Sequence, residues 1–371
     1  MKVRCLGLAC AVFLPLIDAA PPADFDSLFR PLIGAQTPGL AVMVRRDGQT
    51  VFQQGYGVTD IRSLRKIDRA TNFRLASFSK QFTAMTIMLL VHDGKLRYDQ
   101  TLTDIFPDFP PYGRMITIHH LLTHTSGLPD YEDLMGGDWS ASHQIGDGEV
   151  LQLLKHQHSG KFAPGTKWDY CNSGYVLLGV VAAKLAGRSF PQVLQQRIFQ
   201  PLHMSSTLAY VKGQPEISHR AYGYSRDEHG ELIPNDQSST SATLGDGGIY
   251  SNLIDLAKWD DALRNNVLIS SHEMSAALTT VLLANGGKTF WPAQPGGDNL
   301  SPDNPVTYGF GWFLDPYKGH TRSWHSGTTC GFRTIIDRFP NDHLSIVILS
   351  NRTDIDPTSL ALQVADMILT K

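Results

Sequence analysis

The sequence predicts an α+β fold in which one antiparallel sheet, built from both ends of the chain, carries a large helical insertion. Strand-like segments occur near the two ends, at residues 40–57 and 308–350, whereas the residues between them are mostly typical of helices and loops. The Asp47-Gly48 pair is a strong hairpin signal. We expect terminal helices to cover the sheet, and a functional site to lie between the sheet and the insertion.

The individual elements follow from local patterns. Residues 23–33 favour a short amphipathic helix, and an apolar face after Ser77 favours a helix that continues almost to the stop signal Gly94. The helical lobe is expected at roughly residues 95–300, with a surface loop at 285–305 that is rich in Gly, Pro, Asn and Asp. Strands are expected at 40–46, 50–57, 308–314, 321–325, 332–338 and 344–350, and further helices at 175–186 and 357–369.

Residues 1–20 have the pattern of a secretory signal peptide. Lys2 and Arg4 precede an apolar run at 5–17, and small residues follow at 19–20. A run of this length is too short to span a bilayer. We therefore expect export to the periplasm or the medium, no transmembrane anchor, and a mature single domain at residues 21–371.

Composition limits the possible partners. The chain has 371 residues, of which 42% are hydrophobic and 18% charged, and a formal charge of −3. This charge argues against nucleic acid as a partner, and no basic run indicates a membrane-surface patch. We expect a monomer.

Ser77 and Lys80 stand one helical turn apart where the apolar helix begins. Residues three apart lie side by side on a helix, so the Lys80 amine can reach the Ser77 hydroxyl and, when neutral, take its proton. The unpaired N–H groups at the helix start also favour negative charge near Ser77. Ser63 and Lys66 have the same spacing, but they lie in the charged run 60–69, which we interpret as a solvated loop.

Tyr170 and Asn172 form a second candidate pair, just before the predicted helix at 175–186. A phenol loses its proton near pH 10, so Tyr170 can act as a base only if a nearby ammonium stabilises the phenolate. Lys80 can supply that charge. Asn172 offers its amide N–H₂ to a substrate carbonyl and its own carbonyl to Lys80.

His325-Ser326-Gly327-Thr328 is the third candidate, at the end of a predicted strand. Gly327 permits close approach of a substrate backbone. The Thr328 N–H can pair with the Ser77 N–H as an oxyanion hole. His158-Ser159-Gly160 repeats the triplet in a polar stretch without a strand pattern, so we set it aside.

Other chemistry has weaker signals. His120 and His124 have a spacing that suits a metal, but the glutamate of a zinc protease helix is missing, and we interpret both as structural. We expect no metal and no cofactor. Cys171 and Cys330 would remain after signal cleavage, and we favour two buried free thiols over a disulfide, although an exported protein permits one.

Three motifs occur in the order Ser77-x-x-Lys80, Tyr170-x-Asn172 and His325-x-Gly327. In this order they resemble the motifs of the serine β-lactamase and penicillin-binding protein superfamily, in its class C-like branch. The resemblance extends from about Phe25 to the end of the chain. It also includes the stretches at residues 116–128, 162–165, 245–251 and 308–312.

The resemblance implies a β-lactamase/transpeptidase-like sandwich with an all-helical lobe. It implies that Ser77 is the acylated nucleophile, that Lys80 and Tyr170 transfer protons, and that Asn172 binds the acyl-side amide. His325, Ser326, Gly327 and Thr328 would form the strand edge along which a substrate lies.

His325 stands where many members of this superfamily have lysine. A lysine supplies a permanent charge near a substrate carboxylate, whereas a histidine with a pKa of about 6.5 is mostly neutral at pH 7. This difference argues against strong β-lactamase activity. The resemblance therefore implies a serine hydrolase acting on an amide or ester, with a β-lactam, a D-amino-acid peptide or a short ester as substrate. The alternative is a non-catalytic protein that binds or senses penicillin or cell-wall peptide.

Overall fold

The computed structural model describes residues 24–214, 216–289 and 307–369 of the chain. The predicted signal peptide and most of the predicted surface loop at 285–305 lie outside these ranges, so export and the loop stay predictions. Within these ranges, no helix has the length and apolar character that crossing a membrane requires.

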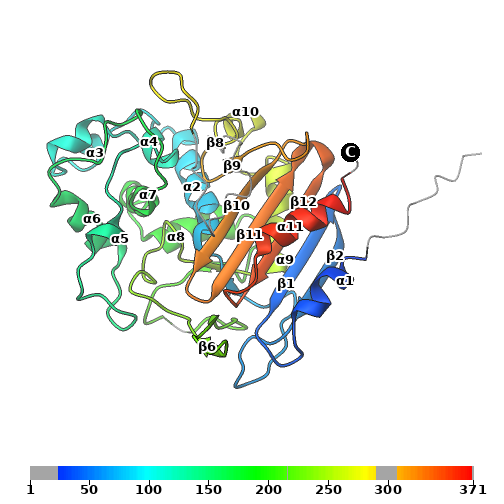
Figure 1. The fold of residues 1–371 in the computed structure, drawn as a ribbon. Coiled ribbons are helices and arrows are strands. Elements are labelled where there is room, and N and C mark those ends of the chain that lie inside the picture. The colour runs from blue at the N-terminus through cyan, green and yellow to red at the C-terminus, as the bar shows by residue number, and fades with distance from the viewer. Residues whose placement is uncertain (1–23, 215, 290–306, 370–371) are drawn as a thin grey trace, which may run out of the picture.

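The described residues form one seven-stranded antiparallel sheet in the order β2-β1-β12-β11-β10-β9-β8, which confirms the predicted fold class. The two ends of the chain meet where β1 pairs with β12, aligning Leu40 with Ser350. Figure 1 shows the blue N-terminal strands beside the orange C-terminal strands. The strands are β1 (Leu40–Arg46), β2 (Gln49–Tyr56), β8 (Thr307–Tyr308), β9 (Phe313–Leu314), β10 (Ser323–Thr329), β11 (Phe332–Phe339) and β12 (Leu344–Ser350).

Helices cover both faces of this sheet. Helix α11 (Pro357–Asp366) contacts β11 and β12, and α9 (Leu253–Arg264) contacts β1 and β12. In Figure 1, α11 and α1 (Asp26–Phe29) lie in front of the sheet and α9 lies behind it. Because neither face of β1 meets solvent, its first six residues are all buried.

Helix α2 (Lys80–His92) lies between the sheet and the helical lobe. It packs against α7 (Asn172–Ala186), while the 3₁₀ turn before it, Ala76–Ser79, contacts β10 and β11. Every residue of α2 from Lys80 to Leu90 is buried, as expected for a central helix. The other helices are α3 (Leu102–Ile105), α4 (Ile118–Leu122), α5 (Tyr131–Leu134), α6 (Asp147–Lys155), α8 (Phe190–Leu194) and α10 (Ser271–Met274).

Short strands complete the described residues. They are β3 (Phe73–Arg74), β4 (Leu208–Ala209) and β7 (Ile249–Ser251), which form one small sheet, and the pair β5 (Tyr224–Arg226) and β6 (Leu232–Pro234). Helix α9 falls inside the segment predicted as the helical lobe, residues 95–300, but it packs on the large sheet. The lobe boundaries otherwise stay a prediction.

Three predicted elements differ from the structure. Residues 308–314 form the hairpin β8–β9 rather than one strand, because the chain reverses around Gly311, whose φ is +76°. The predicted strand at 321–325 starts later and continues to Thr329. The first helix stops at Phe29 and gives way to a 3₁₀ turn, Arg30–Leu32, because the ring of Pro31 removes a backbone donor.

Candidate active site

Ser77 and Lys80 are in direct contact, as their spacing predicted. Lys80 Nζ donates a hydrogen bond to Ser77 Oγ at 3.0 Å. Ser77 is partly exposed and is the second residue of the 3₁₀ turn, whereas Lys80 is fully buried. Ala76, directly before the serine, adopts a left-handed φ of +51°, a conformation that costs a residue with a side chain about 1 kcal/mol or more. Such strain directly before a partly exposed serine is typical of functional sites.

Lys80 holds the site together through three acceptors. Besides Ser77 Oγ, its Nζ donates to Asn172 Oδ1 at 2.8 Å and to the carbonyl of Asp246 at 3.0 Å. Tyr170 is a further hydrogen-bond partner of Lys80, so the three protons of an ammonium are shared among four groups. Because Ser77 Oγ accepts a bond from Lys80, its own hydroxyl proton is available to the Tyr170 oxygen, with which Ser77 is hydrogen-bonded.

Tyr170 lies over Lys80, with its ring centroid 4.9 Å from Nζ. Burial raises the pKa of Tyr170 above 10, although the Lys80 charge and hydrogen bonds to Lys80 and Ser77 oppose this shift. Tyr170 therefore rests as a phenol near neutral pH. The phenolate that a base requires is therefore disfavoured in the free protein, and the role of Tyr170 in proton transfer stays a prediction.

His124 supports Tyr170 and was missed as a site residue by the sequence analysis. The two rings stack with centroids 4.2 Å apart, and His124 Nδ1 accepts the Cys171 N–H at 3.1 Å. Burial, the Lys80 charge and His325 hold the pKa of His124 well below 6.5, so a neutral ring packs beside the ammonium. The only sequence signal was that His124 falls in the stretch 116–128, which carries part of the resemblance.

Strand β10 forms the opposite wall of the site. Its outer edge pairs with β9 only at Ser323 and Trp324, so among the described strands none covers that edge from residue 325 onward. Ser326 on this part of the strand is buried and Thr328 is exposed. The structure thus keeps the predicted place for an extended substrate, although His325 to Thr328 lie inside the strand rather than at its end. The oxyanion hole stays a prediction.

Gly327 has a structural role that the sequence did not indicate. A Cβ at this position would lie 2.0 Å from the Leu75 carbonyl oxygen and 2.3 Å from Thr334 Oγ1. Thr334 Oγ1 itself donates to that carbonyl at 2.7 Å. Gly327 therefore lets β10 pack closely against the segment that carries Ser77, and its expected closeness to a substrate backbone stays a prediction.

Substituting Gly327 with alanine is expected to lower turnover by about 10²-fold, because a shift of about 1 Å between β10 and Ser77 misplaces the reacting groups. The melting temperature should also fall. Gly148→Ala in α6 is the matched control, because a Cβ there meets nothing within 4 Å. Equal kcat/KM and Tm for Gly327→Ala and wild type would show that the close contact is unimportant.

His325 is buried and points away from solvent. Its Nδ1 donates to the Ser326 carbonyl at 2.7 Å, so its Nε2 accepts from the Tyr308 hydroxyl at 2.9 Å. Burial and the Lys80 charge lower the pKa of His325 to about 3. The ring is thus neutral across the physiological pH range and supplies no charge for a substrate carboxylate.

Carboxylates gather on the other side of Lys80, near Asn172. Glu132 Oε1 accepts from Asn172 Nδ2 at 3.2 Å, and Asp130 Oδ2 accepts the Asn172 N–H at 2.6 Å. Partial enclosure of its carboxyl group and the charges of Asp130 and Asp246 raise the pKa of Glu132 to about 7. Glu132 as a residue is exposed, so its carboxylate borders the open part of the site.

The remaining candidate residues are the two cysteines and the histidines with metal-like spacing. Cys171 and Cys330 are both free thiols, as favoured from the sequence. Cys171 is buried as expected, but the expected burial of Cys330 is wrong, because it lies partly exposed just after the end of β10. His120 Nδ1 accepts the Thr117 N–H at a helix start. In the described part of the chain, no group of three or more His, Cys, Asp or Glu side chains could hold a metal ion.

Nucleophilic catalysis requires a hydroxyl with a proton-transfer group within hydrogen-bond reach, and Ser77 has two such groups in Lys80 and Tyr170. Together with the edge of β10 that no described strand covers, this arrangement defines a serine hydrolase. A family model described as beta-lactamase matches residues 25–366. The chain belongs to the β-lactamase family.

Relatives support this assignment. The chain is 34% identical to penicillin-binding protein 4* of Bacillus subtilis over 343 residues, which is 88% of this chain and 71% of that protein. It is 27% identical to a D-aminopeptidase of Cereibacter sphaeroides, covering 88% of this chain but only 60% of that protein. The structure of an octameric penicillin-binding protein homologue from Pyrococcus abyssi has a TM-score of 0.77 at 25% identity, covering 93% of this chain and 77% of that one. Because that homologue is an octamer, the monomeric state stays a prediction.

Proposed function

We propose that this serine hydrolase forms an acyl-enzyme at Ser77 with an amide or peptide of a D-amino acid, and that Glu132 binds the free ammonium group of that residue. The observation that carries the proposal is that Lys80 Nζ donates hydrogen bonds both to the Ser77 hydroxyl and to Asn172 Oδ1. The Cereibacter sphaeroides relative is a D-aminopeptidase, which supports an acyl group of D configuration.

In the proposed reaction, the Tyr170 and Lys80 pair first releases one proton to solvent, so that together the two groups hold one proton fewer than the phenol and ammonium of the resting protein. Ser77 Oγ then attacks the carbonyl carbon, and its proton passes to this pair. The leaving amine takes that proton as the C–N bond breaks. Water then attacks the ester carbon, releases the acid and restores the serine. The N–H groups of Ser77 and Thr328 would stabilise the oxyanion in both steps. The class C-like assignment is part of this proposal and is supported by Tyr170-x-Asn172.

Charge favours a cationic substrate over an anionic one. On the β10 side, His325 is neutral and gives a carboxylate no charged partner. On the Asn172 side, Glu132 borders the open site beside Asp130. Asn172 Nδ2 uses one proton for Glu132, and its second proton is available to the acyl-side carbonyl. An ammonium on the α-carbon beside that carbonyl would then lie close to Glu132.

Changing Glu132 to glutamine is expected to raise KM for a free D-amino-acid amide about tenfold at pH 8, because a charge-assisted hydrogen bond is lost. The effect should shrink at pH 6. The pKa of Glu132 is raised to about 7, so in the wild type its carboxylate is mostly ionised above that pH and mostly neutral below it. Steady-state kinetics with D-phenylalaninamide between pH 6 and 8 measure both effects.

Asp133→Asn is the matched control, since Asp133 is an exposed neighbour that lies 3.4 Å from Lys161 Nζ. The N-acetylated substrate is a second control, because it carries no ammonium and should respond little to Glu132→Gln. A KM that rises equally for both substrates would contradict amine recognition by Glu132 and leave the acyl-enzyme chemistry untouched.

The overall function is tested by the intact mass of the protein mixed with D-phenylalaninamide, its L enantiomer or benzylpenicillin, with product followed in parallel. We expect turnover of the D amide and a lasting penicillin adduct on wild-type protein, and neither with Ser77→Ala. Rapid penicillin consumption with little adduct would instead define a β-lactamase. An absence of turnover and adduct with every probe would favour a non-catalytic binder.

A further inference from the structure

A cavity of about 430 Å³ lies at one end of the large sheet, beneath the C-terminal end of α9. Its rim includes Gly48 from the β1–β2 turn and His343 from the turn between β11 and β12. None of the residues assigned to catalysis or substrate binding around Ser77 lines it. The volume falls in the range of small-molecule sites.

A row of polar side chains crosses the sheet at this end. Cross-strand pairs align Ser323 of β10 with Arg338 of β11, Arg338 with Ser345 of β12, and Ser345 with Arg45 of β1. All four residues are at most 8% exposed. Three of them contain a buried atom without a hydrogen-bond partner in the described residues, namely Ser323 Oγ, Ser345 Oγ and Arg45 Nε. Buried polar groups without partners are uncommon and require an explanation.

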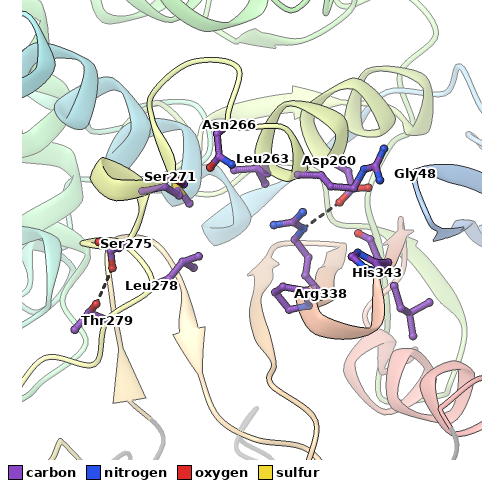
Figure 2. Close-up of a pocket in the computed structure, with 15 residues that line it drawn as sticks. Gly48, Asp260, Leu263, Asn266, Ser271, Ser275, Leu278, Thr279, Arg338 and His343 are labelled. Carbon is purple, nitrogen blue, oxygen red and sulfur yellow. Dashed lines mark hydrogen bonds and ion pairs between the residues drawn. The ribbon is translucent and has the colours of Figure 1, made fainter.

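Arg338, one residue of this row, lines the cavity and has N–H donors without a hydrogen-bond partner in the described residues. Its Nε donates to Asp260 Oδ1 at 3.0 Å, and this is its one hydrogen bond within the described part of the chain. Both Nη groups are thus available, and Arg338 and Ser345 both line the cavity. Figure 2 shows Arg338 rising from β11 toward Asp260, with Leu278 pointing into the same space.

The cavity wall combines positive charge with an apolar surface. Asp260 is neutralised by Arg338 and by Arg45, whose Nη1 lies 3.4 Å from Asp260 Oδ2. Arg264 at the rim is exposed, and no ion pair to it occurs in the described residues. The apolar part of the lining consists of Leu263, Met274, Leu278, Pro340 and Leu344.

We propose that this cavity binds a small monocarboxylate that carries a short apolar chain. The carboxylate accepts from the Arg338 Nη groups and the Ser345 hydroxyl, and the chain packs on Leu263, Met274 and Leu278. An arginine with two adjacent donors matches a carboxylate in a bidentate way, and the buried serine gains the partner it lacks. The site is separate from Ser77 and does not depend on the function proposed there.

The test is titration calorimetry of the full-length protein with sodium hexanoate, with hexan-1-ol and inorganic phosphate as comparison probes. We expect saturable binding of hexanoate only, because hexanol lacks the anion and phosphate lacks the chain. Binding of all three alike, or of none, would overturn the proposal.

Two variants locate the site. Leu278→Glu places a negative charge in the cavity wall and should weaken hexanoate binding about fivefold or more. Ile254→Glu on α9 is the matched control, because both residues are 37% exposed and Ile254 does not line the cavity. Arg338→Lys keeps a cation beside Asp260 but loses the fork of donors, and should weaken binding about tenfold. Unchanged hexanoate affinity in both Leu278→Glu and Arg338→Lys would place the ligand elsewhere and overturn the proposal.

Discussion

Replacing Ser77 with alanine is expected to reduce turnover of a D-amino-acid amide by about 10⁴-fold or more, and to abolish the covalent adduct with benzylpenicillin. The reason is that Ser77 Oγ supplies the bond to the acyl group, and no neighbouring group can replace it. The fold should survive, because Ser77 is partly exposed and the ammonium of Lys80 keeps its bonds to Asn172 and Asp246. Initial rates and intact mass measure the two effects.

The chain contains its own control for this prediction. Ser63 has a lysine three residues later, as Ser77 has, but it is exposed in a turn. Ser63→Ala should leave the rate and the adduct unchanged. If Ser77→Ala retained the wild-type rate, the assignment of the nucleophile would be wrong, whatever the fold.

Lys80→Met should lower turnover by about 10³-fold, because the proton-transfer pair loses its cation while the volume of the side chain is nearly conserved. The melting temperature should also fall, since Asn172 Oδ1 and the Asp246 carbonyl lose a donor inside the protein. Rates, thermal unfolding and the pH profile separate the catalytic from the structural loss.

Lys66→Met is the corresponding control. Lys66 is exposed and donates only to the Ala35 carbonyl in the described residues, so both activity and stability should change little. A Lys80→Met variant that kept more than about a tenth of the wild-type rate would contradict the proposed mechanism. It would show that Tyr170 accepts the serine proton without an ammonium beside it.

Much of the fold was predictable because local patterns and burial agree. The run at Leu40–Arg46 is apolar along almost its whole length, as expected for a strand that is covered on both faces, and the Asp47-Gly48 pair fixes where it turns. At residues 308–314 the prediction of one strand was wrong, because there the local pattern and the packing disagree. Their apolar and aromatic side chains resemble a strand, but the two glycines let the chain reverse, and packing against the start of α2 decides the conformation.

The site was predictable only where its residues lie close together in the sequence. Ser77 and Lys80 could be paired from helical spacing, whereas His124, Glu132 and the Asp246 carbonyl come from separate segments that the tertiary structure brings to Lys80 and Tyr170. The charge state of His325 also needed the structure. Its unperturbed pKa predicts a mostly neutral ring at pH 7, but only the burial of the side chain shows that it stays neutral far below that.

The sheet that joins both ends of the chain has a consequence for how the protein acquires activity. The hydrogen bond from Ser350 to Gly39 spans 311 positions, and the bond from Thr334 to Leu75 spans 259. Contacts of such separation form late and slowly, because a long loop must close before they contribute. A growing chain that has already passed Ser77 and Lys80 still lacks β10 and β11. The nucleophile thus remains without its opposite wall, and the nascent polypeptide catalytically silent, until almost the entire sequence has been made.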